Sequence, residues 1–160
     1  FTNESSPHKE KIDFSSALGI DMVSKLNNCS ISFDSSKNAT VLTVTGNDPY
    51  FSISYSDSAK DLFASDFPKL RITYMVPTGQ SSSNFSYALY PCAGTISAPT
   101  AQAQIYKTTG IIADGAYHTL EIDLSQYSFW TGKINLIRFD FFNDSRIGDV
   151  FYITSFELVK

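Results

Sequence analysis

The sequence predicts an all-β fold: one two-layer antiparallel β-sandwich of the jelly-roll type. Three observations predict it. Runs of alternating apolar and polar residues recur at intervals of roughly a dozen residues, as half-buried strands do in sandwiches. The segments between these runs carry Gly, Asn, Asp and Pro, the residues that tight turns require. Only two stretches, 16–26 and 57–65, have a pattern that permits helical turns, and both are short.

Each expected strand follows from the period-2 pattern, because successive side chains of a strand point to opposite faces. A short strand is expected at 11–14, followed by clearer ones at 30–34, 39–45, 50–55, 69–76, 84–90, 101–107, 117–124, 134–142 and 150–159. The segments at 45–49, 77–84, 113–117 and 143–149 have turn chemistry. No internal repeat is present, so we expect two facing sheets within one domain.

The alternation also assigns one face of each strand to the core. The expected core residues are Phe51, Ile53 and Tyr55; Leu70, Ile72, Tyr74 and Val76; Phe85, Tyr87 and Leu89; Leu120, Ile122 and Leu124; and Ile137, Phe139 and Phe141. The opposite faces then carry Ser86, Ala88 and Tyr90; Gln102, Gln104 and Tyr106; Tyr117, Thr119 and Glu121; and Arg138, Asp140 and Phe142.

Length and composition bound the organisation of the chain. With 160 residues, 42% of them hydrophobic, it can close a core as a single domain at 11–160, preceded by a linker remnant at 1–10. Charged residues make up 18% and the net charge is −4, without the basic stripe that nucleic-acid binding requires. No segment reads as a signal peptide or a membrane helix, so membrane insertion is not expected.

The two cysteines, Cys29 and Cys92, lack the spacing of a metal site. Two interpretations stay open, one disulfide or two buried thiols. In either state we expect no role in ligand binding.

The outer faces are unusual because they carry aromatic rings and amides where Thr, Lys and Glu are common. A sugar suits such a surface: its axial C–H bonds pack on a ring and its hydroxyls take fixed donors and acceptors. Arg138 and Asp140 lie on one face of their strand, so they either bind a sugar ring or form a surface ion pair of little value. Trp130 either packs at the end of the sandwich or offers a flat ring on which a sugar stacks. Tyr50 likewise either packs at the start of its strand or offers such a ring.

No catalytic constellation is present in the sequence, so we expect no enzyme activity. His8 lies in the expected linker, and His118 reads as a structural histidine. Glycoside cleavage needs paired carboxylates, and Glu121 with Asp123 is the only tidy pair. Exposed acids at that spacing are common.

The segment DGAYHTLEIDLSQYSFWTGKINLIRFDFFNDSRIGDVFYITSFELV, with TGNDPYF upstream, resembles the β-sandwich carbohydrate-binding modules of bacterial glycoside hydrolases and surface-attached polysaccharide proteins. Such modules share a dG-x-(W/Y)-H-T strand, a W-x-G-x-I-x-x-(L/I)-R-(F/L)-D segment and a closing G-D-x-(F/Y)-Y-I strand. The resemblance is sharp over 114–158. The sequence departs from it at Thr154, where an acidic residue is common.

The resemblance implies a non-catalytic module that binds a plant cell-wall β-glycan, with xylan as first choice. It implies that the strands near 50, 84, 101 and 134 form one sheet, whose outer face is a shallow cleft. The candidate carbohydrate-binding residues are Tyr50, Tyr90, Gln104, Tyr106, Trp130, Arg138, Asp140 and Phe142. The alternative is a structural or adhesive domain that packs against a neighbouring domain.

The resemblance also implies the setting of the module. We expect a bacterial protein, extracellular or attached to the cell surface, monomeric, and joined to a catalytic domain such as a xylanase. No cofactor is required. Many such modules carry a stabilising calcium ion, whose oxygen ligands would come from the loops at 46–49 and 143–149. No metal ligand is assigned.

Overall fold

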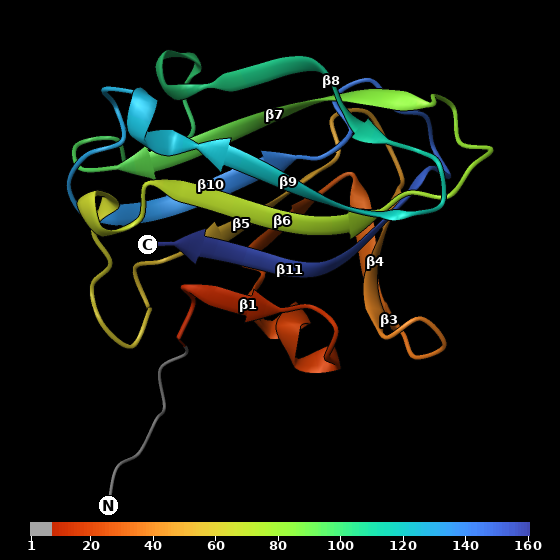
Figure 1. Cartoon of the computed structure of the whole chain (residues 1–160), viewed down its shortest axis with the longest axis horizontal. Coiled ribbons are helices and arrows are strands. Elements are labelled where there is room, and N and C mark those ends of the chain that lie inside the picture. The colour runs from red at the N-terminus through yellow and green to blue at the C-terminus, as the bar shows by residue number, and fades with distance from the viewer. Residues whose placement is uncertain (1–7) are drawn as a thin grey trace, which may run out of the picture.

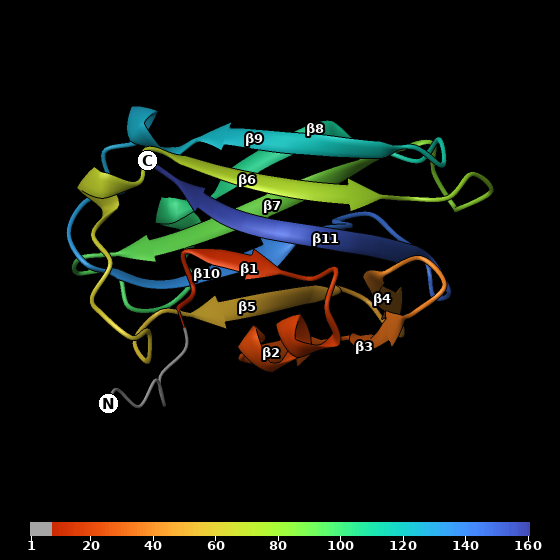
Figure 2. The same cartoon turned by 60° about the horizontal axis from the view of Figure 1, so that its bottom comes forward.

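The computed structural model describes residues 8–160 and forms two antiparallel sheets packed face to face (Figures 1 and 2). The first sheet, called sheet A, has the order β3-β4-β11-β6-β9, with β1 pairing to β11. Its strands are β1 (Lys11–Asp13), β3 (Cys29–Asp34), β4 (Ala39–Val44), β6 (Lys69–Met75), β9 (Tyr117–Asp123) and β11 (Val150–Val159). The predicted all-β sandwich is confirmed.

The second sheet, called sheet B, has the order β2-β5-β10-β7-β8. Its strands are β2 (Lys25–Asn27), β5 (Tyr50–Ser54), β7 (Asn84–Ala93), β8 (Ile105–Ile112) and β10 (Ile134–Asp140). The strands expected near 50, 84, 101 and 134 therefore do share one sheet. The edge strand β2 was not predicted, because two of its three residues lie in the stretch 16–26 that permitted a helical turn.

Short 3₁₀ turns account for the remaining differences from the expected elements. They are η1 (Ala17–Met22), η2 (Ala64–Asp66), η3 (Ala101–Ala103) and η4 (Leu124–Gln126). The strand expected at 101–107 begins only at Ile105, because the Thr100 side chain accepts from the Gln102 amide and starts a turn. The helical turn expected at 57–65 is wrong except for its last two residues, which belong to η2.

The core lies between the sheets and is dominated by phenylalanine. Phe51 of β5 lies at its centre, with ring centroids of Phe139, Phe141 and Phe156 at 5.9, 6.2 and 5.8 Å. The expected core residues are buried except Leu120, which is half-buried. Burial of this apolar area is the main stabilising contribution of the fold.

Contacts with the domain begin before residue 11. The Lys9 ammonium is buried and donates to the Ser54 carbonyl at 2.7 Å and to Asp57 Oδ1 at 2.8 Å. The expected linker therefore includes at least one residue that packs on the sandwich, while residues 1–7 lie outside the described part of the chain. Within residues 8–160, no helix has the length and apolar character needed to cross a membrane.

The two cysteines are separate buried thiols, which decides between the two interpretations left open by the sequence. Burial raises the pKa of both Cys29 and Cys92 to about 11. Thiols with such pKa values hold little thiolate and react poorly at neutral pH.

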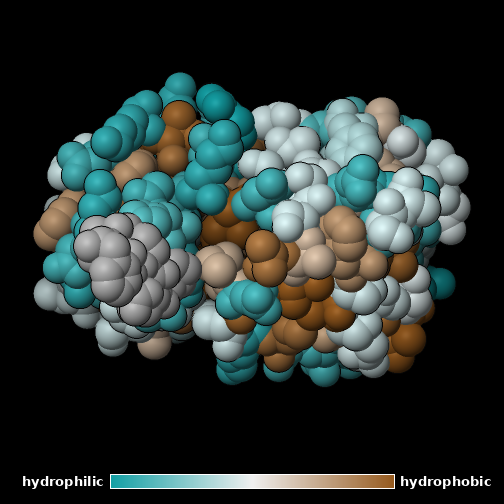
Figure 3. Space-filling model, turned by 90° about the horizontal axis from the view of Figure 1, so that it is seen from below, coloured by the Kyte–Doolittle hydropathy of each residue, from teal (hydrophilic) through white to brown (hydrophobic). Residues whose placement is uncertain are grey.

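An apolar surface lies at the open edge of the sandwich, beside η1 and β2. Figure 3 views the molecule from this side and shows hydrophobic residues gathered there. Leu18 and Leu26 are exposed, and a hollow of about 230 Å³ is lined in part by Ile20, Val23 and Ile31. Exposed apolar surfaces of this kind are characteristic of contact sites.

Candidate functional site

The strand register gathers four candidate residues on the outer face of sheet B. Arg138 of β10 pairs with Tyr90 of β7, and Asp140 pairs with Ala88, which in turn pairs with Tyr106 of β8. Directly paired residues in an antiparallel sheet point to the same side. We call this surface the Arg138 face, made by Tyr50, Tyr90, Gln104, Tyr106, Arg138 and Asp140.

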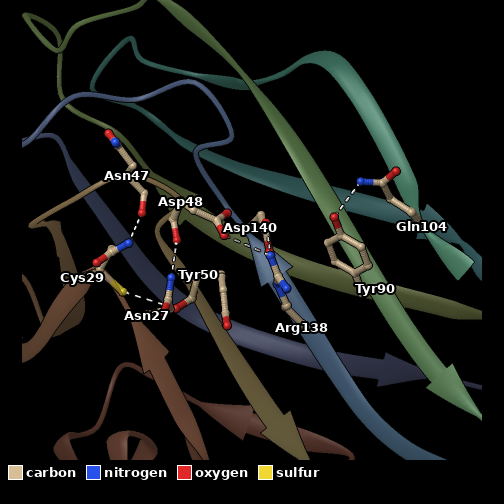
Figure 4. A network of polar contacts seen from close by, with 10 residues as sticks. Asn27, Cys29, Asn47, Asp48, Tyr50, Tyr90, Gln104, Arg138 and Asp140 are labelled. Carbon is tan, nitrogen blue, oxygen red and sulfur yellow. Dashed lines mark hydrogen bonds and ion pairs between the residues drawn. The ribbon is translucent and has the colours of Figure 1, made fainter. Parts of the chain in front are cut away.

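The Arg138 guanidinium is held by two tyrosine rings (Figure 4). Its central carbon lies 3.6 Å from the ring centroid of Tyr50 and 4.6 Å from that of Tyr90. Both distances are within the range of cation–π attraction. Tyr50 is buried and contacts the guanidinium closely, so its ring supports Arg138 more than it offers a surface of its own.

Arg138 also forms a two-point ion pair with Asp140. Nε donates to Oδ1 at 2.8 Å and Nη2 donates to Oδ2 at 2.9 Å, which is the strong bidentate geometry. Only 18% of the Arg138 side chain and 2% of the Asp140 side chain are exposed. The pair is therefore not the solvated surface ion pair that the sequence left open, and within residues 8–160 Nη1 makes no hydrogen bond to Asp140 or Asp48.

A second carboxylate, Asp48, completes the charge arrangement. Asp48 Oδ2 lies 3.5 Å from Arg138 Nη2, and Asn27 Nδ2 donates to the Asp48 carbonyl at 2.8 Å. Asp48 has a φ of 64°, a left-handed conformation that Asp tolerates better than most residues. The sequence analysis missed Asp48 as a site residue, although the turn TGNDP that carries it was recognised.

The environment of Asp140 changes its acidity. Burial raises the pKa of its carboxyl to about 6, the hydrogen bonds from Arg138 act in the opposite direction, and the nearby Asp48 carboxylate adds to the rise. Ordinary aspartates titrate near 4. Asp140 is therefore expected to gain a proton in mildly acidic solution.

We expect a ¹³C NMR titration of the Asp140 carboxyl to have its midpoint near pH 6. Because the folded-state pKa lies above the unfolded value, the protonated carboxyl favours the folded state. This contribution to stability is complete below about pH 4 and is lost as the pH rises through about 6. Urea titrations across this range should show the loss for the wild type and not for Asp140→Asn. A midpoint below 4 would contradict the prediction.

The other end of the Arg138 face carries the exposed groups. Gln104 Nε2 donates to the Tyr90 hydroxyl at 2.7 Å, and Tyr106, on the edge strand β8, is 47% exposed. Beside Arg138 lies a pocket of about 320 Å³, lined by Lys25, Tyr50, Ser52, Pro99, Leu136 and Arg138. The sequence analysis did not single out Lys25, Ser52, Pro99 or Leu136, since residues that line a pocket only after strands pair leave no local signal.

Two candidate residues are not at this face. Phe142 is fully buried, and its ring stacks on Phe85 with centroids 4.0 Å apart, because β10 ends at Asp140 and the alternation stops there. Trp130 is buried too, and its Nε1 donates to the Phe67 carbonyl at 2.8 Å. Both assignments to the binding surface were wrong: these rings belong to the core.

Two acidic side chains of the 143–149 loop accept hydrogen bonds from backbone amides. Asp149 accepts from the amides of Ser81 and Arg146, and Asp144 accepts from the amide of Ser86. No group of three or more His, Cys, Asp or Glu side chains within 8–160 is arranged to hold a metal ion. No calcium ligand is therefore assigned.

Glu121, Asp123 and His118 lie on strand β9 of sheet A. Glu121 forms ion pairs with Arg71 at 2.8 Å and Lys69 at 3.4 Å, and the hydrogen bond from Arg71 lowers its pKa. His118 Nε2 lies 2.9 Å from Asp114 Oδ1. A general acid for glycoside cleavage needs a raised pKa. The pKa of Glu121 is lowered, which is the opposite of what that role requires.

Comparison with known proteins shows which fold the chain has. No family model and no curated protein matches the sequence. Among solved structures, the CBM22-1 xylan-binding domain of Xyn10C from Paenibacillus barcinonensis is similar over 99% of both chains, with 11% identity and a TM-score of 0.57. The module CtCBM11 is similar over 99% of this chain and 98% of its own, with 16% identity and a TM-score of 0.53.

A third similar structure is an enzyme. The arabinose-bound α-L-arabinofuranosidase MgGH51 matches 94% of this chain, with 12% identity and a TM-score of 0.52. The match covers only 25% of the enzyme, so the likeness is to one part of it. The chain has the β-sandwich fold of carbohydrate-binding modules.

Proposed function

We propose that this chain is a non-catalytic module that binds a polysaccharide on the Arg138 face. The observation that carries the proposal is that one outer face of sheet B carries an exposed ring, Tyr106 on β8, the held guanidinium of Arg138 on β10, and the 320 Å³ pocket beside Arg138. Rings bind the C–H faces of sugars, and fixed donors bind their hydroxyls. A hydroxyl-rich sugar chain lying along sheet B would use both.

Xylan is our first-choice ligand, within the class of plant cell-wall β-glycans. One structure that shares the fold is a xylan-binding domain, and this similarity supports the choice of xylan. We further propose that the module is a monomer, extracellular or attached to a bacterial cell surface, and that it brings an appended enzyme such as a xylanase to its substrate. Affinities are expected to be micromolar to millimolar, because a shallow wet surface competes with water for every hydroxyl.

Replacing Tyr106 with alanine should weaken glycan binding about 5- to 30-fold and leave the fold stable, because a stacking ring contributes roughly 1–2 kcal/mol. The ring is 47% exposed, so its loss opens no cavity. Tyr117→Ala is a matched control: that ring is also 47% exposed but lies on sheet A. Calorimetry with xylo- and cello-oligosaccharides measures both variants.

The two variants separate the proposed site from a general effect of losing an exposed ring. Loss of binding only in Tyr106→Ala supports the Arg138 face. Binding by Tyr106→Ala as tight as that of the wild type would place the site elsewhere. Affinity electrophoresis in gels containing soluble polysaccharides tests the choice of xylan among other glycans.

The second candidate function is a structural domain that packs against a neighbour. The apolar surface beside η1, with Leu18 and Leu26 exposed, is the observation that favours it. This surface lies at the open edge of the sandwich, and Lys25 lines both its hollow and the pocket beside Arg138. Absence of retardation by any glycan in the electrophoresis experiment would favour this second function.

A further inference from the structure

Lys25 gives the pocket beside Arg138 a positive end. It lies on the edge strand β2, where it pairs with Ser52 of β5, and its side chain is exposed at the pocket. Arg138 lines the same pocket and also pairs with Ser52 from the other side of β5. Two cationic side chains from the strands that flank β5 therefore lie at one cavity of about 320 Å³.

The charge of Lys25 is not neutralised within the described residues. Its ammonium lies 5.7 Å from the Tyr50 ring centroid, and no Asp or Glu of residues 8–160 forms an ion pair with it. The two acids of this region are both occupied by Arg138: Asp140 by two hydrogen bonds and Asp48 at 3.5 Å. By contrast, Lys9, Lys69 and Lys133 each contact a carboxylate.

The register separates the positive and negative groups along β2 and β5. Asn27 pairs with Tyr50 and binds the Asp48 carbonyl, whereas Lys25 lies two residues away along β2, opposite Ser52. Tyr50 therefore lies between an acidic end, with Asp48 and Asp140, and a basic end, with Lys25. An uncharged glycan has no group that requires such a basic end.

We propose that the pocket selects a glycan that carries a carboxylate, with the Lys25 ammonium and Nη1 of Arg138 as the partners of a uronic acid residue. This inference rests on the proposed glycan-binding function and names the class of glycan. Charge-assisted hydrogen bonds to a carboxylate are about twice as strong as neutral ones, so an acidic sugar gains more from this pocket than a neutral one does. Arg138 is a planar donor that suits a carboxylate, and Lys25 adds a mobile point charge.

Two xylo-oligosaccharides of equal backbone length provide the test, one unbranched and one bearing a glucuronic acid branch. In calorimetry at low salt, the acidic member should bind the wild type about three- to tenfold more tightly, because a partly exposed ion pair contributes modestly. The preference should fall as NaCl is raised to about 0.5 M, where screening shortens the range of the charges. Lys25→Gln should remove the preference by lowering the affinity for the acidic member.

The charge-matched control is Lys11→Gln, which removes a lysine from β1 of sheet A and should keep the preference. Equal binding of both oligosaccharides by the wild type would overturn the inference while the proposed function stands. A preference that persists in Lys25→Gln would overturn the assignment to Lys25. Binding of neither oligosaccharide by the wild type would count against the glycan-binding function itself and the inference with it.

Discussion

Replacing Arg138 with alanine is expected to lower the free energy of unfolding by about 3–5 kcal/mol and to abolish detectable glycan binding, because removing one partner of a buried ion pair leaves the other charge unpaired. The partner left behind is Asp140, of which 2% is exposed. Arg138 lowers the pKa of Asp140, so without Arg138 this pKa should rise above its wild-type value of about 6. The cost should therefore shrink in mildly acidic solution, where the stranded carboxyl is protonated. Urea denaturation at pH 5 and pH 8 measures the loss of stability and its dependence on pH.

The matched control for this prediction is Arg71→Ala on sheet A. Arg71 donates to Glu121 Oε2 at 2.8 Å, the same distance as in the Arg138 pair, but its side chain is 40% exposed and its partner 41%. Solvent screening makes the contribution of such a pair to stability small, so the free energy of unfolding of Arg71→Ala should be close to that of the wild type. Equal losses in the two variants would show that burial does not govern the Arg138 pair.

Replacing Phe142 with alanine is expected to destabilise the fold by about 3–5 kcal/mol and to leave glycan affinity unchanged at temperatures where the variant is folded. The Phe142 ring is fully buried, and its centroid lies 4.0 Å from that of Phe85 and 5.6 Å from that of Phe151. Its removal opens a cavity between the sheets, away from the Arg138 face. Thermal unfolding and calorimetry on the same sample measure both properties.

Tyr106→Ala is the opposite case and serves as the comparison for Phe142→Ala. The exposed ring of Tyr106 should affect binding with little effect on stability, and the buried ring of Phe142 should affect stability with no effect on binding. Loss of binding by a stable Phe142→Ala protein would return that residue to the surface site. The pair of variants thus separates packing from recognition within one domain.

Most of the strands and the assignment of their faces could be predicted from the sequence, because period-2 alternation is a local property. Leu70, Ile72 and Tyr74 point inward on β6 because any strand with that pattern must bury its apolar side. The same rule placed Arg138 and Asp140 together on the outer side of β10. The rule works only while the strand continues. It failed for Phe142, two residues beyond the end of β10, and for the 3₁₀ turn at 101–103, where the Thr100 cap competes with strand pairing.

Only the tertiary structure determines which residues line the pocket beside Arg138. Lys25, Tyr50, Pro99 and Arg138 lie far apart in the sequence and meet because β2, β5 and β10 pair side by side. Burial, too, is a property of the folded chain: it distinguishes the Arg138 pair from the Arg71 pair, raises the pKa of Asp140, and keeps Trp130 in the core. The sequence by itself determined the sandwich and the chemistry available on each face. Which of those groups share a pocket, and which are held without water, depends on contacts between strands that no local pattern records.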